Sequence, residues 1–491
     1  TMVSSSAASD VYKRQAPRRD RDTDRQSHLT QLLGALLPVG VLALSTLWCG
    51  TFSGAATAHG ALAHQALVLA FCILAVDIRD PLQLGHGGRF LLPAVFLAAL
   101  VSAWSSPVGR AGVVGLTLLP AYLLTPAAVA LCWRGPRQRR IGMTALTVLV
   151  LIVGTIALVR WQSLDLARAS LPLGHHNLLA GWLILMLPLT LTGIRTPGAA
   201  RGLAIAAGAL GLLALAATGS FLAIVALAVQ ALLAALWFRR LRGWLVAALV
   251  ILVAVGLPRL LAIASATDPS ALARVSYLQG GWRGSALRPL LGWGPGSTPW
   301  TVGRFLDPRP GIHPASQIVG DLHSLPLQLA YELGFTGLLL SAAIVLVFAL
   351  RRVREARRTD PDGVQCAALL GLAGGAVFAL GSSPLSVPAL PFTSAVVAGV
   401  AIGPRSPSVA RYRRTALSVY LLAAVLFLAP IDRAHLLYDR ARHVESPAAA
   451  LELIDRAVRS DPGLPLSRAR QAWLGAQIDG ADVVRATQAL T

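Results

Sequence analysis

Long apolar runs with polar flanks constrain the fold of this chain more than any other feature of its sequence. A helix that crosses the hydrocarbon core of a bilayer needs about 20 apolar residues, or somewhat fewer where the membrane thins locally. Thirteen such runs can be marked: 29–49, 61–78, 90–104, 113–133, 141–159, 177–193, 202–217, 220–238, 243–264, 324–350, 364–381, 384–402 and 415–430. The sequence therefore predicts an all-α integral membrane protein, a polytopic bundle of about 12–13 transmembrane helices.

The composition argues against a water-soluble core, because 55% of the 491 residues are hydrophobic and only 13% are charged. A formal net charge of +21 would suggest a nucleic-acid partner in a soluble protein. Here the arginines fall in short clusters between apolar runs, which is how membrane proteins set their orientation. The sequence therefore predicts membrane lipid as the surroundings of this chain and no nucleic-acid partner.

The arginine clusters follow even-numbered apolar runs, so the positive-inside rule places them all on the cytoplasmic side. They are Arg79 and Arg89, Arg134 to Arg140, Arg239 to Arg242, Arg351 to Arg358, and Arg405 to Arg414. Residues 1–28 then form a cytoplasmic segment. Residues 1–15 differ in composition from the Ala-, Leu- and Arg-rich chain that follows and are expected to be non-native. The polytopic domain covers 29–430 with a long periplasmic loop at 265–323, and residues 431–491 form a periplasmic helical tail.

Familiar catalytic motifs are missing from the sequence. The four cysteines lie in or beside predicted helices, which offers neither a disulfide framework nor a metal quartet. There is no phosphate-binding glycine loop, zinc-type His-Glu-x-x-His or serine nucleophile elbow. The chemistry is therefore expected to come from scattered polar residues at the outer membrane face, with no metal and no cofactor.

Two ionisable residues, His323 and Glu332, lie where the apolar run 324–350 begins. Ionisable groups beside hydrocarbon are functional candidates by default. Ser324 and Pro326 suit the first turn of a helix, so His323 would sit at the positive end of the helix dipole. Alternatively, His323 merely caps a transmembrane helix.

Glu332 could equally be a structural hydrogen-bonding partner inside that helix. Gly334 and Gly337 fit helix packing better than catalysis, because small residues let transmembrane helices approach closely.

The predicted loop carries an unusual number of arginines for the outer face of a membrane protein. They are Arg274, Arg283, Arg288, Arg304 and Arg309. Guanidinium groups can hold pyrophosphate oxygens in a bidentate fork, which suggests an anion clamp. Long loops escape the positive-inside rule, however, so a solvated domain explains these residues equally well. Gly292 to Gly296 predict a tight turn with an exposed Trp293, either a plain turn or a platform for stacking sugars.

Three motifs in this order resemble the O-antigen ligase and polymerase family. The first is Gly174-His-His-Asn177, and the second is Arg274 to Trp282 followed by Pro289 to Gly296. The third is His323-Ser324, nine residues, then Gly334-Phe-Thr-Gly337. One departure is Ser220-Phe221, where many family members have a Ser-Arg pair.

The resemblance implies a membrane glycosyltransferase in the bacterial inner membrane that takes a glycan from an undecaprenyl-pyrophosphate carrier. The acceptor would be a hydroxyl of lipid A-core, of a glycan or of a protein. His323 would be the general base, and Arg274 with Arg283 would hold the pyrophosphate without a metal. Supporting residues would be Glu332, Asn177, His176, Gly334 and Gly337, and a direct displacement would invert the anomeric centre.

Three alternatives remain open on the sequence. A polymerase would join repeat units, and a protein O-oligosaccharyltransferase would use a protein hydroxyl as its acceptor. A lipid-linked glycan flippase or transporter would show ionisable groups and broken helices near the membrane midplane.

The tail contains one segment with clear helical spacing, Ser446 to Pro462, followed by a second at Leu466 to Ile478. The pair resembles part of a tetratricopeptide array. Because a lone repeat buries too little surface to stand alone, the tail is expected either to dock on the membrane domain or to be cut short at Thr491. A simple amphipathic tail is the other interpretation.

Overall fold

The computed structural model describes residues 21–47, 80–238, 269–307, 319–360, 362–383, 389–404, 411–463 and 465–479, with scattered positions between 242 and 261. Every regular element in these ranges is a helix, and the described ranges contain no strand. Six of these helices are long and apolar enough to span a membrane, and shorter apolar helices accompany them. The chain is an all-α polytopic membrane protein, as predicted. The predicted span at 61–78 and most of 243–264 lie outside the described residues.

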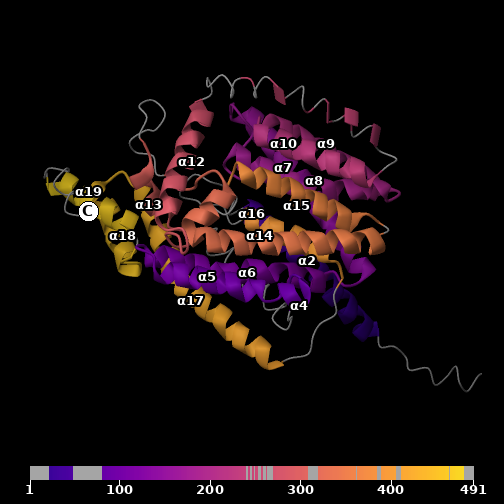
Figure 1. Ribbon diagram of the computed structural model, residues 1–491, viewed down its shortest axis with the longest axis horizontal. Helices are drawn as coiled ribbons and strands as arrows, with labels where there is room; N and C mark the ends of the chain where they lie inside the picture. The colour runs from indigo at the N-terminus through magenta and orange to yellow at the C-terminus, as the bar shows by residue number, and fades with distance from the viewer. Residues whose placement is uncertain are drawn as a thin grey trace, which may run out of the picture.

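The described helices follow the predicted apolar runs closely. They are α2 (Arg21–Leu47), α5 (Leu91–Trp104), α6 (Gly109–Cys132), α7 (Pro136–Ser163), α8 (His176–Thr192), α9 (Ala199–Ala217), α10 (Phe221–Trp237), α14 (Leu325–Thr359), α15 (Val364–Leu380), α16 (Ala389–Ile402) and α17 (Arg411–Arg442). Short α4 (Gly85–Gly88) and η2 (Gly193–Arg195) connect some of them. In Figure 1 most of these helices run roughly along the long axis of the molecule.

Helix α8 forms the centre of the bundle. It packs against α7, α9, α10, α15 and α16, and Trp182, Leu183 and Ile184 are fully buried. A helix that is apolar all round belongs in an interior. The two ends of α8 are therefore held rigidly by its neighbours, which matters because a polar cluster lies at each end.

Helix α14 is broken at Gly334, whose φ of 71° and ψ of 174° are not helical. The backbone groups released by the break are bonded to residues 289–294. The Phe335 amide donates to the Pro289 carbonyl at 2.7 Å, and the Gly294 amide donates to the Glu332 carbonyl at 2.9 Å. The predicted run 324–350 thus forms two helical pieces that meet at Gly334, and a neighbouring turn is hydrogen-bonded to both of them. Only glycine fits here, because a Cβ at Gly334 would overlap the backbone at Leu290.

The predicted loop at 265–323 is largely helical where it is described, a detail that the sequence prediction did not include. It contains α12 (Pro269–Leu287), α13 (Thr298–Thr301) and η4 (Val302–Phe305). Glycines on α12 allow close packing: a Cβ at Gly281 would lie 2.8 Å from Leu322 and 2.9 Å from Leu327.

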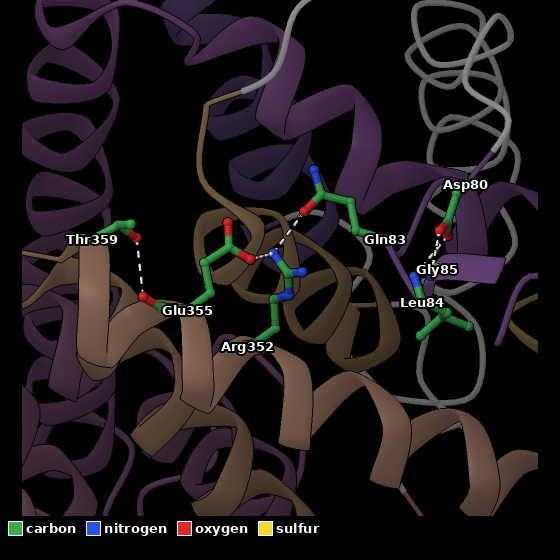
Figure 2. Close-up of polar contacts among 7 residues, drawn as sticks. All are labelled: Asp80, Gln83, Leu84, Gly85, Arg352, Glu355 and Thr359. Carbon is green, nitrogen blue, oxygen red and sulfur yellow. Dashed lines mark hydrogen bonds and ion pairs between the residues drawn. The ribbon is translucent and has the colours of Figure 1, made fainter. Parts of the chain in front are cut away.

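The far end of α14 is tied to the segment before α5 (Figure 2). Buried Arg352 donates from Nη1 to the Gln83 side-chain oxygen at 2.6 Å. The same nitrogen lies 2.7 Å from Glu355 Oε2. Asp80 accepts hydrogen bonds from the amides of Leu84 and Gly85 at 2.8 and 2.7 Å. A buried guanidinium is costly without such partners. This contact therefore holds the last turns of α14 against the segment before α5.

The tail contains the two predicted helices, α18 (Pro447–Ser460) and α19 (Pro465–Asp479). α18 packs on α17 and on α19, with Ile454 and Leu474 buried between them. Helix α17 continues through Pro430 to Arg442, so the predicted boundary at 430/431 falls inside a helix. Figure 1 places α18 and α19 at the same end of the molecule as α12 and α13.

Candidate active site

The start of α8 is organised by two adjacent histidines. His175 has extended backbone angles (φ −140°, ψ 135°) and caps the helix, because its Nδ1 accepts the Asn177 amide proton at 3.2 Å. That bond requires Nδ1 without a proton, which leaves Nε2 to carry it in the neutral ring. The rings of His175 and His176 lie 4.2 Å apart between centroids.

The turn between α9 and α10 lies against the same helix end. The Ser220 hydroxyl donates to the Asn177 side-chain oxygen at 2.8 Å. Arg168, in the loop before α8, has its Nη1 3.1 Å from His176 Nε2. Arg168 also borders Gly219, where a Cβ would lie 3.7 Å from its Nε. The structure thus brings predicted residues His176 and Asn177 together with Arg168, which sequence reasoning did not select.

His323 occupies a bend directly before α14. Its φ of 50° is uncommon for a residue other than glycine. Its amide donates to Asp321 Oδ1 at 2.8 Å, and its Nδ1 lies 3.2 Å from the same oxygen. The Tyr277 ring on α12 lies 5.5 Å from the imidazole between centroids. With 33% of its side chain exposed, His323 is held in place and yet reachable, and α14 begins at Leu325 as predicted.

Electrostatic interactions join these two regions into one cluster. Burial lowers the pKa of His323, and Arg274 lowers it further, whereas Asp321 acts to raise it. Burial also lowers the pKa of His175, and the next largest influence is His323 itself. Both imidazoles are therefore mainly neutral near pH 7. We call His175, His176, Arg168, Arg274, Asp321 and His323 the imidazole cluster.

The two predicted clamp arginines lie on different faces of α12. Arg274 and Arg283 are nine positions apart in the chain, which is about half a turn of rotation around a helix with 3.6 residues per turn. Arg274 influences both histidines. Arg283 Nη1 instead lies 2.7 Å from Asp307 Oδ2, with both side chains more than half exposed. Arg274 therefore acts electrostatically on His323, whereas Arg283 is paired with a carboxylate elsewhere.

Glu332 lies inside the break of α14 and is buried. Its Oε1 accepts from Thr298 Oγ1 at 2.6 Å and from Gln328 Nε2 at 3.1 Å. Its Oε2 accepts the Gly296 amide proton at 2.8 Å. A carboxylate with three donors holds the 292–296 turn against α14.

Gly334 and Gly337 belong to the same region and are buried. Gly334 forms the break itself. Gly337 lies one turn later and packs against Leu333. Trp293 is buried and donates from Nε1 to the Gly284 carbonyl at 2.8 Å. The predicted exposure of Trp293 is therefore wrong, and the indole is not presented for stacking on a sugar.

The imidazole cluster supplies bases and cations. Within the described ranges, no group of three His, Cys, Asp or Glu side chains is arranged to hold a metal ion. What the cluster offers is neutral imidazole nitrogens next to guanidinium groups, a combination that suits proton removal beside a bound anion.

Comparison with known families finds one match, to part of the chain. Residues 203–342 match the family model described as O-Antigen ligase. The match covers less than half of the chain and shows that this segment is similar to the O-antigen ligase family. No curated protein matches the chain. The O-antigen ligase segment includes Arg274, Asp321 and His323, while Arg168, His175 and His176 come from the region before it.

Asp321, His175 and Arg168 were not among the predicted site residues. Asp321 stands two positions before His323, which is the spacing of a side chain that accepts a nearby amide proton. His175 is adjacent to His176, and spacing alone did not distinguish their roles. Arg168 carries no local signal, because its place depends on the packing of α8 against α9.

Proposed function

We propose that this protein transfers a glycan from an undecaprenyl-pyrophosphate carrier to an acceptor hydroxyl at the periplasmic face of the bacterial inner membrane. The observation that carries this proposal is the imidazole cluster, in which the charge of Arg274 acts on His323 and favours its neutral form. The O-antigen ligase family supports glycosyl transfer in general. The donor, acceptor and membrane face are part of the proposal.

His323 is the proposed general base. Its Nδ1 faces Asp321, so Nε2 is the nitrogen that would take the proton of the acceptor hydroxyl. The acceptor oxygen then bonds to the anomeric carbon while the bond from that carbon to the pyrophosphate oxygen breaks. The electron pair leaves with the diphosphate, and this direct displacement inverts the anomeric centre. A neutral imidazole is required at the start, which agrees with the lowered pKa of His323.

Guanidinium groups would stabilise the negative charge that develops on the leaving diphosphate. Arg274 is the first candidate because it lies near His323. Arg168 is the second, because it borders Gly219 next to Ser220, where many family members carry an arginine. Arg168 would supply that charge from another loop. Arg283, the other predicted clamp residue, would have to leave Asp307 first.

An apolar groove of about 300 Å³ supports a lipid-linked donor. It runs along α10, which begins directly after Ser220. Its lining is Phe221, Ile224, Val225, Ala228, Val229, Leu232, Leu249, Leu252, Gly256 and Leu257. A polyprenyl chain in this groove would gain from apolar contact, with its diphosphate close to Ser220 and Arg168.

The transporter alternative has one observation in its favour, the broken helix α14 with Glu332 at the break. In transporters such a break exposes backbone groups to the substrate. Here the 289–296 turn fills it, since the Trp293 amide donates to the Tyr331 carbonyl at 2.9 Å and Gly296 bonds Glu332. The sealed break favours an enzyme. Ligase and polymerase chemistry share the same site and differ in the acceptor.

The decisive experiment is glycan transfer by the purified protein in nanodiscs. The protein receives an undecaprenyl-pyrophosphate-linked glycan and candidate acceptors, and mass spectrometry identifies the product. We expect His323→Ala to lower the transfer rate by about 10²- to 10⁴-fold, the range for loss of a general base. His443→Ala, an exposed histidine in the tail, is the matched control and should transfer normally. Equal activity of both variants would remove His323 from the mechanism.

A further inference from the structure

A polar cavity lies at the opposite end of the bundle from the imidazole cluster. It has a volume of about 520 Å³ and lies among the start of α7, the end of α8 and the start of α9. Helix α8 has 17 residues, so its two ends are about 25 Å apart at 1.5 Å per residue. This basic cavity is therefore separate from the imidazole cluster.

Four arginines and one aspartate line the basic cavity. They are Arg134, Arg139, Arg140, Arg195 and Asp362. Residues from the first turns of α7, α9 and α15 also line it, namely Pro136, Ala200 and Val364. The N-terminal ends of helices carry partial positive charge, which adds to the charge of the arginines. The cavity is strongly suited to an anion.

Arg139 gives the most specific indication of a ligand. It lines the cavity, and its Nη2 is buried with no hydrogen-bond partner among the residues that the structure describes. A buried donor without an acceptor costs free energy. Because this nitrogen is covered, a small rotation of the guanidinium would be needed to bring it to an anionic oxygen bound in the cavity, which would then supply the missing acceptor. A phosphate can accept two parallel N–H bonds from one guanidinium.

A cluster of arginines that only orients the chain in the membrane would need neither a cavity nor a buried guanidinium nitrogen. Orientation requires positive charge near the end of a span, and solvated side chains provide it. Arg137 shows the difference, because it is exposed on α7 and does not line the cavity. The cavity is also partly apolar, with Met143 and Leu203 in its wall.

We propose that the basic cavity binds a phosphate-bearing group, best matched by the headgroup of an anionic phospholipid. Basic pockets between transmembrane helices are known to suit such headgroups. Arg139 would hold the phosphate oxygens, Arg140 and Arg195 would add charge at the rim, and Met143 and Leu203 would contact the first acyl carbons. This site is independent of the proposed glycan transfer.

The test compares Arg139→Gln, Arg140→Gln and Arg137→Gln with the unchanged protein. Each protein is reconstituted in nanodiscs of phosphatidylcholine with phosphatidylglycerol, extracted into mild detergent and examined by native mass spectrometry. A second arm measures thermal stability in phosphatidylcholine nanodiscs with and without inorganic phosphate. Arg140 and Arg137 are both exposed, so these two variants should fold equally well, which elution volume and melting temperature verify.

We expect the unchanged protein and Arg137→Gln to retain about one more phosphatidylglycerol than Arg139→Gln and Arg140→Gln. That result supports a lipid headgroup. Loss of phosphate-dependent stabilisation in the same two variants, with lipid retention unchanged, supports a soluble phosphate compound as the source. If Arg139→Gln and Arg140→Gln match Arg137→Gln in both arms, the proposed site does not exist.

Discussion

At the scale of single residues, His323 is controlled by neighbours with opposite effects. Burial and Arg274 lower its pKa, and Asp321 acts to raise it. Asp321 also accepts the His323 amide proton, so the same carboxylate sets both the position of the ring and part of its basicity. A general base needs this balance, because too low a pKa would make the nitrogen a poor proton acceptor.

The pH dependence of transfer follows from these signs. Because the pKa of His323 is lowered, its neutral form persists below the usual value near 6.5. The fall of kcat/KM on the acidic side of its pH profile, here called the acid limb, should therefore lie at more acidic pH. Asp321→Asn removes the influence that raises the pKa, so the acid limb should move to lower pH. Arg274→Gln removes an influence that lowers it, so the limb should move to higher pH.

The measurement is kcat/KM of the purified protein from pH 4.5 to 8.5 in nanodiscs. Both variants will also transfer more slowly, so the position of each limb is compared and not its height. Shifts in the same direction, or no shift in either variant, would contradict the assignment of the limb to His323.

At the scale of helices, the break in α14 depends on glycine at position 334. Gly334 combines a positive φ with backbone contact to Leu290. We expect Gly334→Ala to lower the free energy of unfolding by about 1–3 kcal/mol or more, because alanine disfavours this conformation and its Cβ meets the neighbouring backbone. Gly303→Ala is the control, since nothing lies within 4 Å of its added Cβ. Thermal unfolding in detergent measures both, and equal melting temperatures would contradict the structural role.

Glu332 offers a test of structure against catalysis within the same helix. An amide in place of the carboxylate turns one acceptor into a donor that faces Thr298, Gln328 or the Gly296 amide. Glu332→Gln should therefore lower the melting temperature while leaving the acid limb of kcat/KM in place. A limb that moves while stability is unchanged would instead place Glu332 in the chemistry.

The predicted helices were largely right because the length of an apolar run decides whether it spans a membrane. Helix α12 could not be predicted, since Gly280, Gly281 and Gly284 disfavour a helix until Leu306, Leu322 and Tyr331 pack against them. Without this helix, the sequence did not indicate that Arg274 and Arg283 lie on different faces of α12. The sequence indicated His323, His176 and Asn177, but the position of Arg168 depends on how α8 packs against α9, and the capping role of His175 could not be told from that of His176 by spacing alone.

At the scale of the whole molecule, the arginine-rich junctions 134–140 and 351–358 lie at the end opposite the imidazole cluster. This follows because α8 and α14 both begin near the cluster, and the basic cavity lies where α8 ends. The arrangement agrees with one orientation in the membrane, in which the cluster faces the periplasm. The orientation itself remains a prediction.

Labelling of single cysteines tests this orientation. In a background without native cysteines, we expect a membrane-impermeant maleimide to label Gly303→Cys and Gln477→Cys in intact spheroplasts. Arg358→Cys should react only after the membrane is permeabilised, because the positive-inside rule predicts that its end of α14 faces the cytoplasm. All three positions are exposed. Labelling of Arg358→Cys alone before permeabilisation would reverse the predicted orientation.

The interruption at Gly334 divides α14 into two pieces with different contacts. Residues before it carry the start of the helix next to His323, and residues after it run to the anchor at Arg352. The first piece is fastened to the 289–296 turn through the carbonyls of Tyr331 and Glu332, and the second piece reaches the same turn through the Phe335 amide. We expect bilayers of different thickness to tilt the second piece while the imidazole keeps its place, so that transfer proceeds at a similar rate in thin and thick membranes.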